Sequence, residues 1–184
     1  MSKKLRAMNI KQPPRLRDEA QSGNPSVGIA YCPKCHSAYE KKSWKHAIVK
    51  ARKLLYGPAK KNGNIKSVLC PACRMAEEHL FEGEIIITNV PSEFLSDLRH
   101  LILRFAENAK RRSPLHRLLK MERVGTGLRI TTTENQLAGR LAKKIVESFK
   151  HHVTLNVVFS REPYEKEFVR LAFAQKGGVG QLDS

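Results

Sequence analysis

Hydrophobic and polar positions follow two different periods in the middle of the chain, and each period predicts an element. Residues 84–90 are mostly apolar and β-branched, as in a buried strand. Residues 94–109 place apolar side chains at i, i+3 and i+4, which predicts a helix that begins after Pro91-Ser92 and ends at Ser113-Pro114. A strand followed by a long helix is therefore expected here.

The same reasoning extends to the C-terminal part of the chain. Residues 118–124 and 128–132 flank Gly125-Thr126-Gly127, a pattern typical of a β-hairpin. Thr133 is predicted to cap a second helix. Its apolar stripe comprises Leu137, Leu141, Ala142, Ile145, Val146 and Phe149. Residues 153–160 and 168–173 supply further strands.

The order β-α-β-β-α-β, with one extra strand, predicts a split βαβ domain of the ferredoxin-like type. In that arrangement two helices cover one face of an antiparallel sheet and leave the other face available for a partner. The fold class predicted for the whole chain is α+β. A small module with four cysteines in two C-x-x-C pairs, the pattern of a zinc ribbon, is followed by the βαββαβ domain. We expect a flexible basic tail at 1–29, the cysteine module at 30–81, the βαββαβ domain at 82–174 and a flexible tail at 175–184.

Four cysteines, in two identical C-P-x-C pairs, indicate a metal site. Cys32 and Cys35 form one pair, Cys70 and Cys73 the other, and the chain contains no further cysteine. Zinc takes four tetrahedral ligands at about 2.3 Å, and each C-x-x-C turn offers two thiolates. The sequence therefore predicts one structural zinc ion, which a module of this size needs in order to fold.

Two other interpretations of the cysteines are open. They could form redox dithiols or a disulfide framework, although no secretory signal accompanies them. Four thiolates would leave zinc no open position for catalysis. Three histidines near the cysteines in sequence are interpreted as polar surface or nucleic-acid contacts rather than ligands, namely His36, His46 and His79.

The charge of the chain predicts a polyanionic partner. Its 34 Lys and Arg residues outnumber 17 Asp and Glu residues, for a net charge of +17, which exceeds what solubility requires. No apolar run is long enough to span a bilayer, and residues 1–24 contain no secretory signal pattern, so a cytoplasmic protein is expected. Organelle targeting through the basic start of the chain is the alternative.

A basic segment between the cysteine pairs is the predicted site of RNA contact. Residues 42–56 have helical apolar spacing, and residues 57–64 form a lysine-containing loop suited to phosphate contact. A solvated charged face and a membrane-surface helix are the alternatives. The candidate RNA-binding residues are Lys34, Lys41, Lys42, Lys45, Lys50, Arg52, Lys53, Lys60, Lys61, Lys66 and Arg74.

Motifs of enzyme chemistry are missing from the sequence. It contains no H-E-x-x-H, no G-x-S-x-G and no convincing carboxylate pair. Residues 176–180 resemble a phosphate-binding loop, but Gln181 stands where the lysine would follow. We therefore expect a protein without enzymatic activity and without a small-molecule substrate.

Several motifs together resemble a known zinc-ribbon family. They are Tyr31-Cys-Pro-Lys-Cys-His36, Cys70-Pro-Ala-Cys-Arg74, Glu82-Gly-Glu84, Arg129-Ile-Thr-Thr-Thr133 and Gln136-Leu-Ala-Gly-Arg140. In this order they resemble the large-ribosomal-subunit export adaptors of nonsense-mediated-decay name, especially uncharacterised bacterial relatives, over residues 30–173. The export adaptors have more cysteine pairs and carry export signals that this chain lacks, so the resemblance implies binding to a ribosomal subunit but not export.

From the sequence we therefore expect a ribosome-associated, rRNA-binding zinc protein that acts in assembly, quality control or dormancy. A DNA-binding or transcription-associated zinc ribbon is the alternative. A third possibility is an enzyme subunit in which the zinc module is structural.

Overall fold

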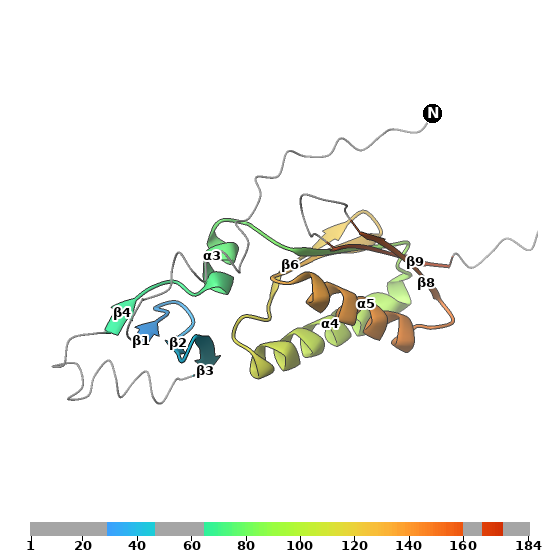
Figure 1. Cartoon of the computed structure of the whole chain (residues 1–184). Helices are drawn as coiled ribbons and strands as arrows, with labels where there is room; N and C mark the ends of the chain where they lie inside the picture. Colours follow the sequence, from blue (N-terminus) through green and yellow to red (C-terminus); the bar gives the residue numbers. More distant parts are fainter. Residues whose placement is uncertain (1–28, 47–64, 160–166, 175–184) are drawn as a thin grey trace, which may run out of the picture.

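The protein is an α+β structure with two mixed sheets, shown by a computed structural model that describes residues 29–46, 65–159 and 167–174. The described part contains three helices. A small four-stranded sheet lies at one end of the molecule, and a larger five-stranded sheet with two helices lies at the other (Figure 1). The predicted α+β class is confirmed.

The small sheet is formed by β1 (Ile29–Tyr31), β2 (Ser37–Glu40), β3 (Ser43–His46) and β4 (Ile65–Ser67), in the order β3-β2-β1-β4. β1 pairs antiparallel with β2 and parallel with β4. A short helix, α3 (Pro71–Glu77), follows β4 and was not expected from the sequence. Its proline stands at the first helical position, where a missing N–H costs nothing.

The helix predicted over residues 42–56 is wrong at its start. Ser43–His46 is a strand that pairs with β2, so that Trp44 lies opposite Tyr39. The two rings are in contact, with centroids 5.5 Å apart. This cross-strand aromatic contact and the ladder override the helical spacing of the segment. Residues 47–56, the rest of the predicted helix, lie outside the described residues.

The larger domain has the predicted order of elements. It comprises β5 (Gly83–Thr88), α4 (Ser92–Arg112), β6 (Leu118–Val124), β7 (Gly127–Thr132), α5 (Asn135–Ser148), β8 (Val153–Phe159) and β9 (Glu167–Phe173). The predicted hairpin is confirmed, because β6 and β7 pair antiparallel across a turn in which Gly125 has φ +58°.

The sheet of this domain is mixed rather than antiparallel, which corrects the sequence-based expectation. Its strand order is β6-β7-β5-β9-β8, and β9 pairs with β5 in parallel. The final strand thus lies between β5 and β8. Its apolar face explains this central position, because Val169 and Leu171 lie opposite Ile85 and Ile87 and all four are buried.

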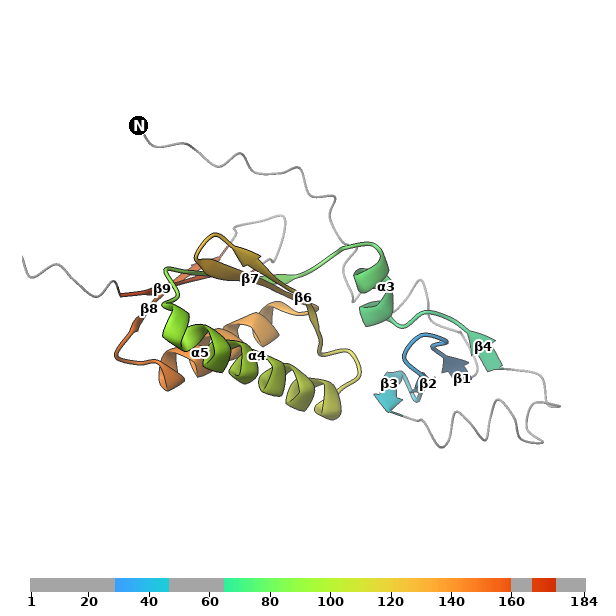
Figure 2. The same ribbon diagram turned by 180° about the vertical axis from the view of Figure 1, so that it is seen from behind.

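Both helices of the larger domain, α4 and α5, lie side by side on one face of its sheet (Figures 1 and 2). The core between helices and sheet includes Ile85, Leu98, Ile102, Ile130 and Ile145, all with no exposed surface. Extensive burial of this kind stabilises the domain without any metal.

The opposite face of the large sheet carries an ion-pair network. Arg129 donates to Glu84 at 2.5 Å and to Glu122 at 2.8 Å, and its guanidinium lies 5.5 Å from the centroid of the Phe81 ring. Lys120 extends the network through a 2.6 Å contact with Glu122. These charges are therefore largely neutralised within the domain. Among the described helices, none is long and apolar enough to cross a membrane.

Candidate metal centre

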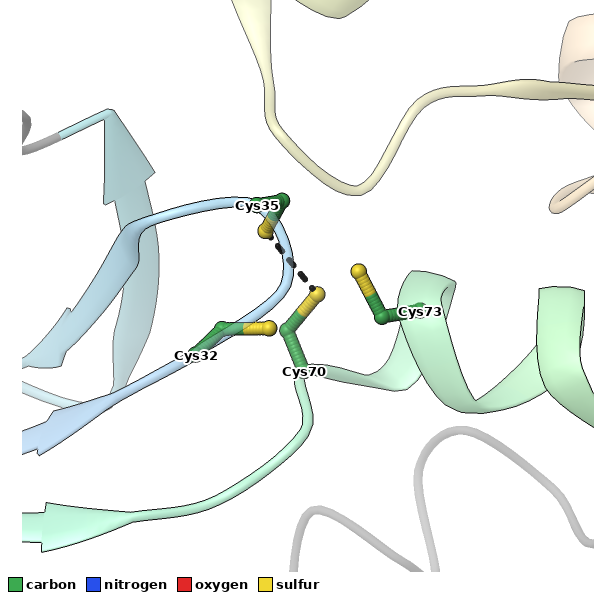
Figure 3. Close-up of side chains that lie close together, drawn as sticks. All are labelled: Cys32, Cys35, Cys70 and Cys73. Atoms are coloured by element: carbon green, nitrogen blue, oxygen red, sulfur yellow. Dashed lines mark hydrogen bonds between the residues drawn. The ribbon is translucent and has the colours of Figure 1, made fainter.

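The four cysteines come from two segments that are distant in sequence. Cys32 and Cys35 belong to the loop between β1 and β2, whereas Cys70 precedes α3 and Cys73 lies in its first turn (Figure 3). The first loop is closed by a hydrogen bond from the Cys32 N–H to the Ser37 carbonyl at 2.9 Å. His36, directly after the first pair, has φ +61°, and the second pair is closed by a hydrogen bond from the Cys73 N–H to the Cys70 carbonyl at 3.0 Å. Each C-x-x-C pair therefore forms a tight turn that presents two sulfurs.

The sulfurs of Cys32, Cys35, Cys70 and Cys73 lie within 4.8 Å of one another. Sulfurs at about 2.3 Å from a tetrahedral metal ion would be separated by about 3.8 Å, and the Cys35 and Cys70 sulfurs are 3.5 Å apart. This distance is well beyond the roughly 2.05 Å of a disulfide bond, and all four cysteines are free. The cluster could therefore bind one metal ion.

Proton sharing within the cluster also fits a cation site. A hydrogen bond from Cys70 lowers the pKa of the Cys35 thiol to about 3, and the same contact raises the pKa of Cys70. Burial is the main cause that raises the pKa of Cys73 to about 11. Close, desolvated thiols cannot all ionise alone, whereas a divalent ion would replace their protons.

The cysteines also form the core of the small module. Cys32, Cys70 and Cys73 are buried and pack with Ala72, while Cys35 and Trp44 are partly buried against them. Apart from cysteine, the fully buried side chains of this cluster are small. A metal ion held here would thus occupy the place that a larger hydrophobic core has in the other domain.

A charged contact of the cluster comes from the other domain and was missed by sequence reasoning. Nη1 of Arg117 lies 3.4 Å from the sulfur of Cys73, and Nη2 lies 3.9 Å from that of Cys70. Burial lowers the pKa of the Arg117 guanidinium, but the hydrogen bond with Cys35 and the thiolate charges outweigh it, and the pKa is raised. No spacing rule connects residue 117 with cysteines some 45 positions earlier, so only the tertiary structure could place it.

The predicted RNA-binding residues fall into three groups. Lys41, Lys42, Lys45 and Lys66 are exposed on the small sheet and have no ion pair within the described residues. Lys34 is paired with Glu77 at 2.6 Å, and Arg74 is partly buried and engaged within the protein. The remaining candidates lie outside the described residues, and they are Lys50, Arg52, Lys53, Lys60 and Lys61.

The three histidines near the cysteines do not join the metal-ligand cluster. The His36 ring contacts the Tyr31 hydroxyl, and Nε2 of His46 donates to the Lys110 carbonyl at the end of α4. His79 is exposed after α3 with φ +56°. His46 therefore contributes a further contact between the small module and the larger domain.

Comparison with known proteins adds no relative to this picture. No protein-family model matches the chain, and a search of curated proteins finds no match. The geometry of the four cysteines is thus what the metal-binding assignment rests on.

Proposed function

We propose that the protein is a cytoplasmic, non-enzymatic, ribosome-associated factor that binds rRNA through its cysteine module and holds one structural zinc ion. Zinc suits four thiolates, three of them from buried cysteines, better than the harder divalent cations do, since those take oxygen ligands. Four thiolates fill a tetrahedral shell, so this centre is suited to support the module rather than to catalyse a reaction.

The turn between β2 and β3 is the observation that carries the RNA-binding proposal. Its two residues, Lys41 and Lys42, have φ +51° and +61°. Two-residue hairpin turns of this kind strongly favour Asn-Gly, because other side chains are strained at positive φ, by roughly 1–2 kcal/mol each. Two adjacent exposed lysines in a strained turn are a poor choice for stability alone, which favours a function for their charges.

Two further lysines of the small sheet are exposed. Lys45 is exposed on β3 and Lys66 on β4, so both edge strands of the small sheet carry an exposed cation. Lysine is a suitable contact for phosphate oxygens, and such contacts position a protein on RNA without reading its sequence. The ribosomal assignment within this class is supported by the resemblance of the cysteine and β-strand motifs to the export adaptors.

Replacing the turn residues tests the proposal, because the stability of the module should rise while its affinity for rRNA should fall. Lys41→Asn with Lys42→Gly relieves the strained φ angles, so we expect the free energy of unfolding of the module to rise by about 1 kcal/mol. Loss of two phosphate contacts should weaken rRNA binding about tenfold at 0.15 M salt, with a log–log salt slope less steep by about 1.4. Binding is measured by fluorescence anisotropy with rRNA fragments at several salt concentrations.

A matched control separates a local contact from total charge. Lys143→Gln with Lys150→Gln also removes two positive charges, but from exposed positions in and just after α5. We expect this variant to change the affinity for rRNA much less. Equal losses in both variants, or unchanged binding in the turn variant, would refute a phosphate contact at the turn.

Gradient sedimentation and crosslinking identify the partner. The proposal predicts co-migration with a ribosomal subunit and crosslinks from Lys41 or Lys42 to rRNA. Free migration together with retention on DNA would instead support a DNA-binding protein and would overturn the ribosomal assignment.

A further inference from the structure

The loop between α4 and β6, residues 113–117, reaches from the larger domain to the metal-ligand cluster. Its Leu115 packs against the buried cysteines, and its Arg117 guanidinium spans the sulfurs of Cys73 and Cys70 at 3.4 and 3.9 Å. In Figure 3 the pale yellow ribbon of this segment bends toward the four sulfurs. The cluster is thus enclosed partly by residues outside its own module.

The larger domain holds this loop in place by its own hydrogen bonds. The buried Thr133 hydroxyl donates to the Leu115 carbonyl at 2.7 Å, and it accepts from the Arg117 N–H at 2.9 Å. The Thr133 N–H donates to the Arg117 carbonyl at 3.0 Å. Thr133 therefore braces the loop rather than capping α5, which corrects the sequence-based prediction; the N-cap position belongs to Glu134.

The Arg117 guanidinium is further oriented by the backbone of its own loop. Nε of Arg117 donates to the Pro114 carbonyl at 2.7 Å, which leaves the two terminal nitrogens directed at the sulfurs. A side chain fixed in this way loses little freedom when it binds a charged centre.

We propose that the larger domain supplies Arg117 to the metal centre of the cysteine module. This contact would link metal binding in that module to docking of the two domains. A divalent ion with four thiolates carries two excess negative charges, and these are costly in a buried site. Arg117 offsets one of them with hydrogen bonds to sulfur, as outer-shell partners do at other metal sites. The inference rests on the proposed metal centre but not on RNA binding.

The geometry distinguishes Arg117 from Lys34, another cation near the cluster. Lys34 lies within the Cys32–Cys35 turn, but its ammonium is exposed and paired with Glu77 at 2.6 Å. Arg117 is partly buried, and its terminal nitrogens contact sulfur rather than a carboxylate. Because it belongs to the other domain, its interaction with the charged centre can exist only when the domains are docked.

Zinc affinity of the full-length chain, measured by competition with a chromophoric chelator, tests the inference. Arg117→Met should weaken zinc binding about 10- to 100-fold, the range found for outer-shell substitutions. Arg117→Lys, which keeps the charge but loses the planar fork, should fall between this variant and the parent. Arg112→Met removes the same charge from an exposed position at the end of α4 and should change affinity less than twofold.

A measurement on the unsubstituted chain covers the case in which Arg117→Met fails to fold. The Nε–Hε resonance of Arg117, assigned by its loss in Arg117→Lys, should shift when zinc is added, whereas that of Arg112 should not. An unshifted Arg117 resonance, or Arg117→Met affinity within twofold of the parent, overturns the inference. If the parent chain takes up no zinc, the proposed metal centre itself fails and the inference fails with it.

Discussion

Removing the C-x-x-C pair Cys70 and Cys73, half of the candidate metal site, should unfold the small module and leave the larger domain folded. The perturbation is the double substitution Cys70→Ser with Cys73→Ser. Ala76→Ser, at an exposed position of the same helix, introduces the same residue without touching a ligand. It serves as the matched control.

The expected magnitude follows from what the small module buries. Apart from cysteine, the described buried apolar side chains of residues 29–80 are three alanines and Met75. At about 0.8 kcal/mol per methyl group and at most about 3 kcal/mol for methionine, they contribute roughly 5 kcal/mol. Structural zinc contributes about 10–16 kcal/mol in comparable sites. The metal is therefore expected to be the larger contribution to the stability of this module.

The larger domain should respond differently, because its main cluster contains fourteen buried residues and no metal ligand. Losing the contacts of Leu115 and Arg117 with the cysteines should lower its stability only slightly.

Hydrogen exchange measured by mass spectrometry, with metal content determined on the same samples, resolves the two parts. We expect full exchange at β1, β2 and α3 in the double variant and native protection at β5 and β9. If the double variant contains no metal and its β1 and β2 stay protected from hydrogen exchange, this reasoning is refuted. Loss of protection throughout the chain would show instead that the larger domain also depends on the metal.

Three further outcomes are expected. Zinc binding at pH 7 should release about two protons or more, because the raised pKa values of Cys70 and Cys73 keep both thiols protonated before binding. Zinc affinity should therefore rise with pH. Calorimetry in buffers of different ionisation enthalpy counts the released protons, and fewer than one proton per zinc ion would contradict this prediction. Arg129→Met should destabilise the larger domain by about 3 kcal/mol in urea unfolding, since Glu84 is left buried without its ion-pair partner; adding Glu84→Gln should restore part of the loss, and no recovery would count against the ion pair as the cause. Ile130→Ala should cost about 2–5 kcal/mol in the same assay with zinc content unchanged, and a loss of zinc would show that the metal site depends on this core.

The sequence by itself determined the elements whose signals are local. Turn residues and alternating apolar positions predicted the β6–β7 hairpin, and helical spacing predicted α4 and α5, because each of these patterns acts over a few neighbouring residues. Cysteine spacing similarly predicted four close sulfurs, since two C-x-x-C turns with no other cysteine leave few ways to pair.

Local signals were misleading where a distant partner decides the conformation. Ser43–His46 carries helical spacing but is a strand, because its hydrogen-bonding groups are taken by β2 and Trp44 packs on Tyr39. The apolar period of β9 predicted a strand but could not show that it lies beside β5 in parallel. Strand order depends on which apolar faces meet, and the periodicity within one strand carries no information about its neighbours.

The contact between the domains was decided by tertiary structure alone. Thr133 is a residue type that often caps helices, yet its hydroxyl holds the loop that places Arg117 at the sulfurs. The two C-x-x-C turns are sufficient to predict a metal site, because their ligands are set by short-range geometry. Its neutralising cation lies 44 residues beyond Cys73, and only the packing of one domain against the other brings these opposite charges together.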